Sequence, residues 1–500
     1  MTLACVQSRA LLGLAAPAVT VEVHLANGLP SLSLVGLADV EVKEARERVR
    51  CALQNSGLEF PNNKRITVNL APADLPKDSG RFDLPIALGI LAASGQIPLE
   101  ALHGWEFAGE LSLSGALRPV RGGLVSSLHG GDQRLVLPLD SAREAALAPA
   151  AQVFGAAHLL DVVAHLLGQP GGEGWQRITA QAPVQRTSGP DLADVKGQVQ
   201  AKRALEIAAA GGHGLLLVGP PGAGKSMLAQ RFSSLLPAMT EQEALESAAV
   251  ASLAGRFDPQ EWGLRPTSAP HHTASAVALV GGGSPPRPGA ISLAHHGVLF
   301  LDEFPEFARS ALEALREPLE NGHITIARAA LSSQFPARFQ LLAAMNPCPC
   351  GFHGSTQRPC RCSPQQIGRY QGKLSGPLLD RIDLHVHVPA LPAQELLQAP
   401  TGESSAAIRQ RVVQARQRAV ARQGGANQQL HGQQLEAVLQ LEPAAHALLH
   451  KAAERLAWSA RATHRTLRVA RTIADLAGGE GIASAHVAEA IQYRNVLLKN

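Results

Sequence analysis

Apolar and polar positions along the first third of the chain change period several times over short distances. Residues 19–25 alternate apolar and polar side chains with a period of two, which is typical of a half-buried strand. Neighbouring stretches carry helical patterns instead. This mixture predicts one α/β domain over residues 1–168. The expected strands are 19–25, 65–70 and 134–138, and the expected helices include 39–54 and 84–93.

The pattern changes twice more toward the C-terminus. Residues 169–190 are rich in Gly, Pro, Gln and Ser and lack periodicity, so they are interpreted as a linker. From 191 to 395 strands and helices alternate, as βαβ units require. Residues 396–500 predict helices only. The helical stretches are 404–423, 432–441, 444–461, 467–477 and 484–498.

Composition narrows the class of protein. A chain of 500 residues predicts about three domains, and its low aromatic content of 4% suits helices and α/β layers. The net charge of +4 does not by itself indicate a nucleic-acid partner. Six cysteines are too few for a secreted disulfide framework, and no apolar run approaches the ~20 residues that span a bilayer. We expect a soluble cytoplasmic protein with no membrane partner.

A continuous apolar run at residues 215–218 leads into a glycine-rich loop and then a helical stretch. Such a run is typical of a strand buried on both faces. The loop fits the G-x-x-x-x-G-K-S pattern in its required strand–loop–helix context, so its backbone N–H groups are expected to surround the phosphates of ATP. The lysine should reach the β- and γ-phosphates and the serine hydroxyl should ligate Mg²⁺. The loop residues are Gly219, Pro220, Pro221, Gly222, Ala223, Gly224, Lys225 and Ser226.

Two further apolar runs end in polar residues. Residues 297–301 end in Asp302 and Glu303, and residues 339–345 end in Asn346. Asp302 is expected to hold Mg²⁺, and Glu303 to act as the base that polarises the attacking water. Asn346 is predicted to orient that water, because ligands of open α/β sheets bind at the carboxyl edge of the strands. An ordinary strand-ending turn is the alternative for Asn346.

Longer stretches around these motifs resemble the Mg-chelatase-like AAA+ ATPases, and among them the competence protein ComM (YifB) family. The likeness rests on residues 269–273 (Ala-Pro-His-His-Thr), 288–304, 345–351 and 375–383, and it covers nearly the whole chain. The chain departs from the family's pattern at Thr267 and Ser268, where an aromatic residue and a cation are usual.

The resemblance implies a hexameric ring with ATP sites between subunits, and it makes the helical segment 396–500 a lid. Arg381 resembles the arginine finger that reaches a neighbour's γ-phosphate, a task that suits the permanently charged guanidinium. Arg468 resembles the sensor 2 arginine of the lid. Arg471, three residues further on, shares much the same helix face and is the alternative for sensor 2.

Two loops resemble segments that line the pore of such rings. They span residues 280–291 and 324–335 and contain Arg287 and Arg328. These arginines are expected to hold phosphates without reading bases. Ordinary solvated charges are the alternative.

Residues 105–138 resemble the proteolytic domain of Lon, which implies a Lon-protease-like (ribosomal S5 domain 2-like) α+β fold for the N-terminal domain. Lon uses a serine and a lysine. Val125 stands in the place of the lysine, and Phe82 or Asp83 in the approximate place of the serine. A serine needs an adjacent base to become nucleophilic. The domain is therefore predicted to be an inactive scaffold for nucleic acid or ring assembly, not a protease.

Four cysteines form two C-x-C pairs, and four thiolates can satisfy Zn²⁺ in a closed structural site. Free thiols, or His353 in place of one ligand, are the alternatives. The cysteines are Cys348, Cys350, Cys360 and Cys362.

The helix predicted at 404–423 carries five arginines and no acid. Such a run favours an anionic partner, while plain solvation remains an equal alternative because the arginines wrap around the helix.

The predicted function is an ATP- and Mg²⁺-dependent motor on DNA. The resemblance implies a hexameric helicase or branch-migration factor in the recombination of DNA taken up in natural transformation, with single-stranded or branched DNA as partner and recombination proteins as candidate partners. The alternatives are a motor subunit that drives Mg²⁺ insertion into a tetrapyrrole and a protein-remodelling chaperone. The Lon-like domain and the cysteine pairs favour the DNA motor over the chelatase subunit.

Overall fold

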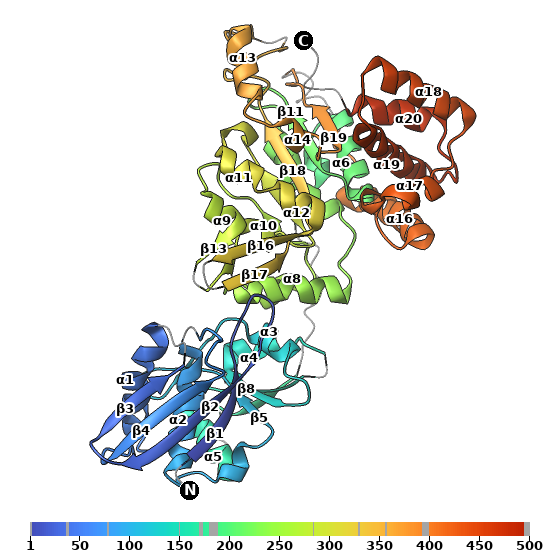
Figure 1. Ribbon diagram of the computed structural model, residues 1–500. Coiled ribbons are helices and arrows are strands. Elements are labelled where there is room, and N and C mark those ends of the chain that lie inside the picture. The colour runs from blue at the N-terminus through green and yellow to red at the C-terminus, as the bar shows by residue number, and fades with distance from the viewer. Residues whose placement is uncertain are drawn as a thin grey trace.

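The computed structural model has an N-terminal body and a larger body that holds the rest of the chain (Figure 1). Among the described helices, none is long and apolar enough to cross a membrane. The structure describes residues 3–36, 40–77, 80–149, 151–169, 174–179, 189–283, 285–328, 331–355, 358–392 and 400–494.

An eight-stranded mixed sheet forms one layer of the N-terminal domain, in the order β10-β9-β8-β5-β1-β2-β4-β3. Val19, Val21 and Val23 of β2 are fully buried, and the residues between them are not. The predicted alternation is therefore confirmed. The strands are β1 (Leu3–Arg9), β2 (Ala18–Asn27), β3 (Ser31–Val35), β4 (Lys64–Ala71), β5 (Trp105–Phe107), β8 (Arg134–Pro138), β9 (Gln152–Ala156) and β10 (Gln176–Ile178), and β6 (Glu110–Leu111) pairs separately with β7 (Leu117–Arg118).

Helices pack on this sheet. The central one, α2 (Asp83–Ala93), is buried along its whole length, as its almost uniformly apolar sequence requires. The others are α1 (Val40–Asn55), α3 (Gly123–Leu128), α4 (Leu139–Ala145) and α5 (Leu159–Leu166).

Part of the predicted linker belongs to this domain. β10 pairs antiparallel with β9, and Trp175 just before it stacks on His165 with ring centroids 4.1 Å apart. Burial of this aromatic cluster fixes residues 174–178 on the N-terminal domain, an effect that composition alone did not reveal.

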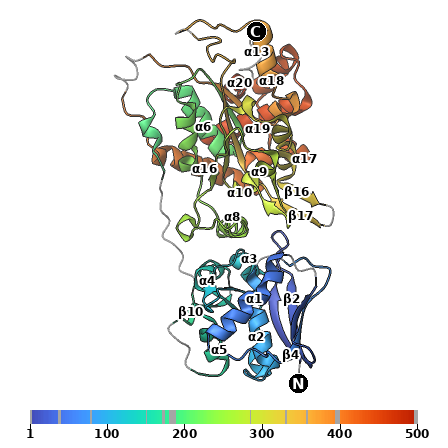
Figure 2. The same cartoon turned by 90° about the vertical axis from the view of Figure 1, so that its left-hand side faces the viewer.

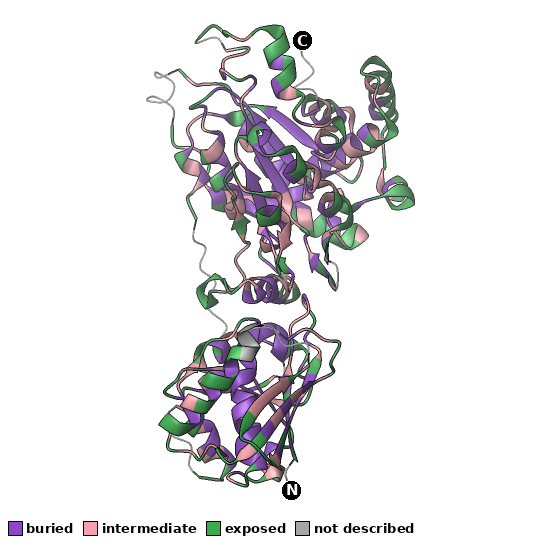
Figure 3. Cartoon of the chain, turned by 60° about the vertical axis from the view of Figure 1, so that its left-hand side comes forward, coloured by how far each residue is buried: buried purple, intermediate pink, exposed green. Residues whose placement is uncertain are grey.

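A five-stranded parallel sheet forms the centre of the larger body, in the order β12-β15-β18-β11-β19. We call this sheet with its flanking helices the P-loop domain. All four residues of β11 and of β15 are buried, as the purple strands in Figure 3 show. The strands are β11 (Leu215–Val218), β12 (Thr267–Ser268), β15 (Val298–Leu301), β18 (Gln340–Met345) and β19 (Leu384–His387).

The P-loop domain also carries short helices and two hairpins. The hairpins are β13 (Gly281–Gly282) with β14 (Arg287–Pro288), and β16 (His323–Arg328) with β17 (Leu331–Pro336). The helices are α6 (Val199–Gly211), α7 (Lys225–Gln230), α8 (Glu241–Leu253), α9 (Ala276–Val280), α10 (Ala290–Leu293), α11 (Arg309–Glu313), α12 (Arg316–Asn321), α13 (Pro364–Gln371) and α14 (Gly376–Leu379).

The C-terminal segment is helical, but the break between the third and fourth predicted helices was misplaced. The helix expected at 444–461 ends at Arg455, and the next helix begins at Ala460 instead of 467. Ala457 has a φ of 48°, which stops the first helix, and the Ser459 hydroxyl accepts from Ala462 N (3.2 Å) to cap the second. The C-terminal helices are α16 (Ser405–Gln423), α17 (Gly432–Val438), α18 (Pro443–Arg455), α19 (Ala460–Ala477) and α20 (Ser484–Gln492).

The N-terminal domain docks on α8, which lies directly above α3 and α4 in Figure 2. Leu124 and Val125 belong to the same apolar core as Leu253 and Phe335 of the P-loop domain. Two hydrogen bonds join the domains at Ser252, one from Gly122 N to its carbonyl (3.2 Å) and one from its hydroxyl to Glu144 (3.0 Å). These contacts hold the N-terminal domain against the edge of the P-loop domain that carries both hairpins.

Candidate nucleotide site

The glycine-rich loop 219–226 connects β11 to α7 at the carboxyl edge of the parallel sheet. Gly219 has to be a glycine, because a Cβ there would overlap the Val388 carbonyl. Gly222 and Gly224 have φ values of 76° and 90°, a region that side chains disfavour. The sequence therefore specifies the tight turn that opens α7, whose N-terminus is suited to hold phosphate.

Lys225 points back across the loop. Its Nζ donates to the carbonyls of Gly219 (2.8 Å) and Pro220 (2.9 Å) and to Asn346 Oδ1 (3.1 Å). Burial lowers the pKa of this lysine, since a low dielectric disfavours its charged form. The structure thus brings Lys225 and the end of β18 together, as the sheet-edge argument predicts.

Ser226 and Asp302 also meet. The serine hydroxyl donates to Asp302 Oδ2 (2.6 Å), and the other carboxylate oxygen accepts from Glu303 N (2.9 Å). Hydroxyl and carboxylate oxygens are the ligands that Mg²⁺ takes beside nucleotide phosphates. The residues present fit a Mg²⁺-nucleotide complex.

Glu303 lies next to this pair but is held by a residue that the sequence analysis gave no role. Its Oε2 lies 2.8 Å from Nδ1 of His272. His272 follows β12, and β12 pairs with β15, the strand that ends before Asp302. This neighbour relation depends on strand order, so no local pattern revealed it. Thr267 and Ser268, where the chain departs from the family's pattern, form β12 itself.

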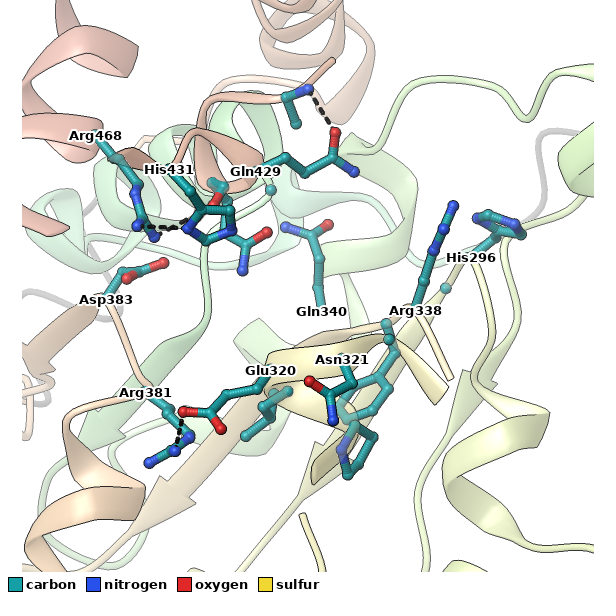
Figure 4. A pocket seen from close by; sticks show the side chains of 18 of the residues that line it. His296, Glu320, Asn321, Arg338, Gln340, Arg381, Asp383, Gln429, His431 and Arg468 are labelled. Atoms are coloured by element: carbon teal, nitrogen blue, oxygen red, sulfur yellow. Dashed lines mark hydrogen bonds and ion pairs between the residues drawn. The ribbon is translucent and has the colours of Figure 1, made fainter. Parts of the chain in front are cut away.

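Arg381 and Arg468 line a different cavity of about 900 Å³, between the P-loop domain and the C-terminal helices (Figure 4). Arg381 pairs with Glu320 and donates to Pro377 O (2.6 Å). Arg468 donates to Gln428 O (3.3 Å) and contacts His431 Nδ1 (3.1 Å).

The described lining of this cavity is strongly basic, with seven arginines against four carboxylates, and it includes no residue of loop 219–226 and neither Asp302 nor Glu303. The two predicted arginines therefore lie together, apart from the phosphate loop of the same chain. The lining arginines are Arg265, Arg338, Arg381, Arg416, Arg461, Arg465 and Arg468.

Arg471 occupies a different environment from Arg468. It is fully buried, bonds to Asp475 (3.0 Å) and donates to the carbonyls of Glu480 (2.6 Å) and Gly479 (2.7 Å). These contacts occupy its guanidinium within one subunit, whereas Arg468 lines the basic cavity.

The four cysteines between 348 and 362 converge, with all four sulfurs within 4.8 Å of one another. Three Sγ–Sγ distances are 3.4, 3.7 and 3.5 Å, near the about 3.8 Å expected around a tetrahedral Zn²⁺ with 2.3 Å bonds. Backbone N–H groups of Cys350, His353 and Cys362 point at the sulfurs. The imidazole of His353 lies outside this cluster of sulfurs.

The remaining predicted residues lie elsewhere. Val125 and Phe82 are fully buried, and Asp83 is buried against Arg48 (2.7 Å), so these positions offer no nucleophile with an adjacent base. Arg287 is exposed on β14. The side chain of Arg328 lies outside the described residues.

Four of the five arginines of α16 make contacts within the chain. Arg411 pairs with Glu206 (2.5 Å), and Arg416 donates to the carbonyls of Ala209 and Ala210 (2.9 and 2.8 Å). Arg418 donates to the backbone carbonyl of Asp475 (2.6 Å), and Arg422 pairs with the Asp475 carboxylate (2.7 Å). These arginines therefore hold the C-terminal helices to one another and to α6. The sequence analysis had considered only an anionic partner or plain solvation for them.

Comparisons with known proteins agree with this architecture. The family model described as magnesium chelatase, subunit ChlI, matches residues 191–396. A model of subunit ChlI of Mg-chelatase matches 21–140, and one of its C-terminal part matches 402–494.

Relatives that match over the whole chain define a narrower family than these three models do. The chain is 51% identical to competence protein ComM of Haemophilus influenzae, over 99% of this chain and 98% of that protein. It is 48% identical to YifB of Salmonella typhimurium over the same shares. A shorter segment is 30% identical to maternal DNA replication licensing factor mcm3 of Xenopus laevis, over 27% of this chain and 14% of that protein.

Fold, site and family models together define an AAA+ ATPase of the Mg-chelatase-like class, which binds ATP with Mg²⁺. Since the likeness to ComM and YifB extends over nearly the whole length of each protein, the chain belongs to the ComM/YifB family.

Proposed function

We propose that the protein is a hexameric ATP-driven motor that moves along DNA and migrates or unwinds branched strands during recombination of DNA taken up by the cell. The observation that carries the ring is the division of the site. Lys225, Asp302 and Glu303 lie at one place on the subunit, and the basic cavity with Arg381 and Arg468 lies at another.

Each half of the site needs the other. An arginine that stabilises charge on a transferring phosphoryl group raises the rate by about 10³–10⁵. None of the contacts described above for Lys225, Asp302 and Glu303 involves an arginine. A head-to-tail ring places the basic cavity of one subunit on the nucleotide of the next. Asn346 and Glu303 would position and activate the water within the subunit that holds the nucleotide.

The DNA substrate is supported by relatives. ComM is named as a competence protein, and mcm3 as a DNA replication licensing factor. The chelatase motor subunit remains the alternative, and the N-terminal domain does not argue against it, because a ChlI model also matches residues 21–140. Identity over the whole chain favours the DNA motor.

The test compares ATPase rates with forked DNA, a three-way junction, a chemically unfolded protein and no addition, using Lys225→Ala as the inactive control. We expect stimulation by branched DNA and strand displacement on the junction. Stimulation by unfolded protein alone would identify a chaperone, and stimulation by neither would favour the chelatase subunit.

We also propose a structural Zn²⁺ at Cys348, Cys350, Cys360 and Cys362. The support is the convergence of four sulfurs at near-tetrahedral spacing with backbone N–H groups aimed at them. The group directly follows Asn346 in the chain, so the metal would fix the segment after β18.

Metal analysis of the purified protein should give about one zinc per chain, and Cys360→Ser should lose it. The same variant should lower the melting temperature, because metal-binding free energy is folding free energy. Cys51 lies outside the four-cysteine cluster, so Cys51→Ser is the matched control. Zinc below about half an equivalent in the wild type would leave the cysteines as free thiols.

A further inference from the structure

A cleft of about 500 Å³ lies between the N-terminal domain and the P-loop domain. One wall comes from the loop before β2 and the segment before α3, and the opposite wall from the end of α8 and both hairpins. The hairpins are the segments that resemble pore loops. The lining residues central to the argument are Arg48, Glu110, Arg121, Pro285, Pro286 and Arg287.

Arg121 and Arg287 face this cleft from opposite domains. Both are exposed, and neither side chain makes a hydrogen bond or ion pair with any residue in the described ranges. Arg121 lies along Gly255, just beyond α8, so its stem is already packed against the P-loop domain. The two arginines therefore line one cleft, and neither guanidinium has an ion-pair partner among the described residues.

The other charged residues of the cleft are occupied. Arg48 is held by Asp83 (2.7 Å), and Glu110 by Arg118 (3.5 Å). With three arginines and one glutamate the cleft is positive overall. Its potential favours an anion, and focusing between two protein walls strengthens that preference.

The remaining lining is largely apolar, with Leu11, Leu253 and several prolines. A volume of this size is ordinary for small-ligand sites, and a site between two domains can also hold a segment of a longer chain. Cations beside apolar walls match a single nucleic-acid strand, whose phosphates are anionic and whose sugars and bases offer apolar faces.

The domain contact keeps this cleft in shape. The shared core at Leu124, Val125 and Leu253, with the hydrogen bonds at Ser252, fixes the N-terminal wall relative to the hairpins. The two domains therefore present Arg121 and Arg287 to the same cleft in a fixed arrangement.

We propose that this cleft binds the phosphate backbone of a single DNA strand, with Arg121 and Arg287 as its contacts, so that the N-terminal domain forms part of the DNA path. The inference rests on the proposed DNA motor and assigns to the N-terminal domain a direct role in holding substrate.

The experiment measures binding of fluorescein-labelled oligo-dT to the full-length protein by anisotropy, with Mg²⁺ and a non-hydrolysable ATP analogue, between 50 and 200 mM salt. The variants are Arg121→Ala, Arg287→Ala and Arg121→Lys. Arg143→Ala is the matched control, since Arg143 is an exposed arginine of the same domain that pairs with Asp140 and does not line the cleft.

Arg121→Ala and Arg287→Ala should each weaken binding about tenfold, as the loss of one charge-assisted hydrogen bond predicts. Each should also reduce the slope of log K against log [salt] by about 0.7, the value for one phosphate contact on a single strand. Oligo-dA should show the same losses, because phosphates carry no sequence. Arg121→Lys should restore the slope, and Arg143→Ala should match the wild type.

Wild-type binding by Arg121→Ala beside a loss in Arg287→Ala would overturn the inference and leave the DNA motor standing. Absence of oligonucleotide binding in the wild type would instead remove the proposed function. Displacement of the oligonucleotide by an aspartate-rich peptide of equal charge would show that the cleft takes an acidic protein segment.

Discussion

At the residue scale, Glu303 combines an unusual backbone with a polar contact. Its φ of 51° lies in the left-handed region, which costs a residue other than glycine about 1 kcal/mol or more. The carboxylate is meanwhile held by His272 at 2.8 Å. We propose that this contact holds the Glu303 carboxylate in a resting position, because a base that polarises water must be free to face the γ-phosphate.

The first prediction concerns His272→Ala. Without the imidazole, Glu303 should reach the water more often, so basal ATPase should rise several-fold and the ratio of DNA-stimulated to basal rate should shrink. His272→Gln keeps an N–H donor and should stay near the wild type. A basal rate that falls in His272→Ala would mean that the histidine orients the base for catalysis instead of restraining it.

A second prediction separates Arg468 from Arg471. Arg471→Ala removes a buried guanidinium that binds Asp475 and two carbonyls, so urea unfolding should show a loss of about 2–3 kcal/mol. Arg468→Ala removes a half-buried guanidinium with a single carbonyl partner, so it should cost clearly less, about 1 kcal/mol, and should lower the ATPase rate of the assembled protein. Equal destabilisation by both variants would contradict the assignment of sensor 2 to Arg468.

The sequence predicts those residues whose chemistry depends on immediate neighbours in the chain. Lys225 and Asp302 could be placed because each follows a continuous apolar strand, and parallel strands end at one edge. His272 could not, since its contact arises from the order of β12 and β15 in the sheet. Arg471 lies on a side of α19 that is fully buried, whereas Arg468 lines the cavity. Helical spacing alone could not tell which side of the helix would be buried.

At the scale of elements, α8 joins two regions of the molecule. Glu243 and Glu246 near its start line the basic cavity, and Ser252 near its end binds the N-terminal domain. A shift of the N-terminal domain would therefore act on the cavity through one rigid helix. The local pattern predicts strands such as β8 and helices such as α16 well. It does not locate the break between α18 and α19, because the positive φ of Ala457 leaves no mark in apolar spacing.

The third prediction concerns the pH dependence of the domain contact. Burial raises the pKa of Glu144 to about 7, against the opposing donors Ser252, Gly123 N and Leu124 N and the nearby charge of Arg81. A raised pKa means that the protonated carboxyl is favoured in the folded protein. Its stabilising contribution is complete below the ordinary value of 4.5 and is lost as pH rises through about 7.

Glu144→Gln keeps the accepting oxygen and removes the titration. Melting temperatures measured from pH 5 to pH 8 should therefore fall more steeply for the wild type than for this variant, with the difference growing between pH 5 and pH 7. Parallel profiles for the two proteins would show that Glu144 does not titrate in this range. Asp140→Asn, an exposed carboxylate on the same helix, should follow the wild type.

At the scale of the whole molecule, the distribution of charge sets what one subunit can do alone. In the proposed mechanism the phosphate loop binds the nucleotide, Asp302 helps to hold Mg²⁺ and Glu303 is the base, while the arginines lie in a separate cavity. A monomer should bind ATP and hydrolyse it slowly. The family resemblance implied that each ATP site is divided between two subunits. That Arg468 lines the same cavity as Arg381 could be seen only from the packing of the C-terminal helices.

The fourth prediction tests the split by mixing two inactive variants. Lys225→Ala lacks the nucleotide half of a site and Arg381→Ala lacks the arginine half, so each ring alone should be inactive. In a ring assembled from equal amounts, an interface works when an Arg381→Ala subunit holds the nucleotide and a Lys225→Ala subunit supplies the arginine. Random head-to-tail assembly makes that about a quarter of interfaces, and ATPase should recover to about that share at most. If each arginine served its own subunit, every subunit would carry one defective half and mixing would restore nothing.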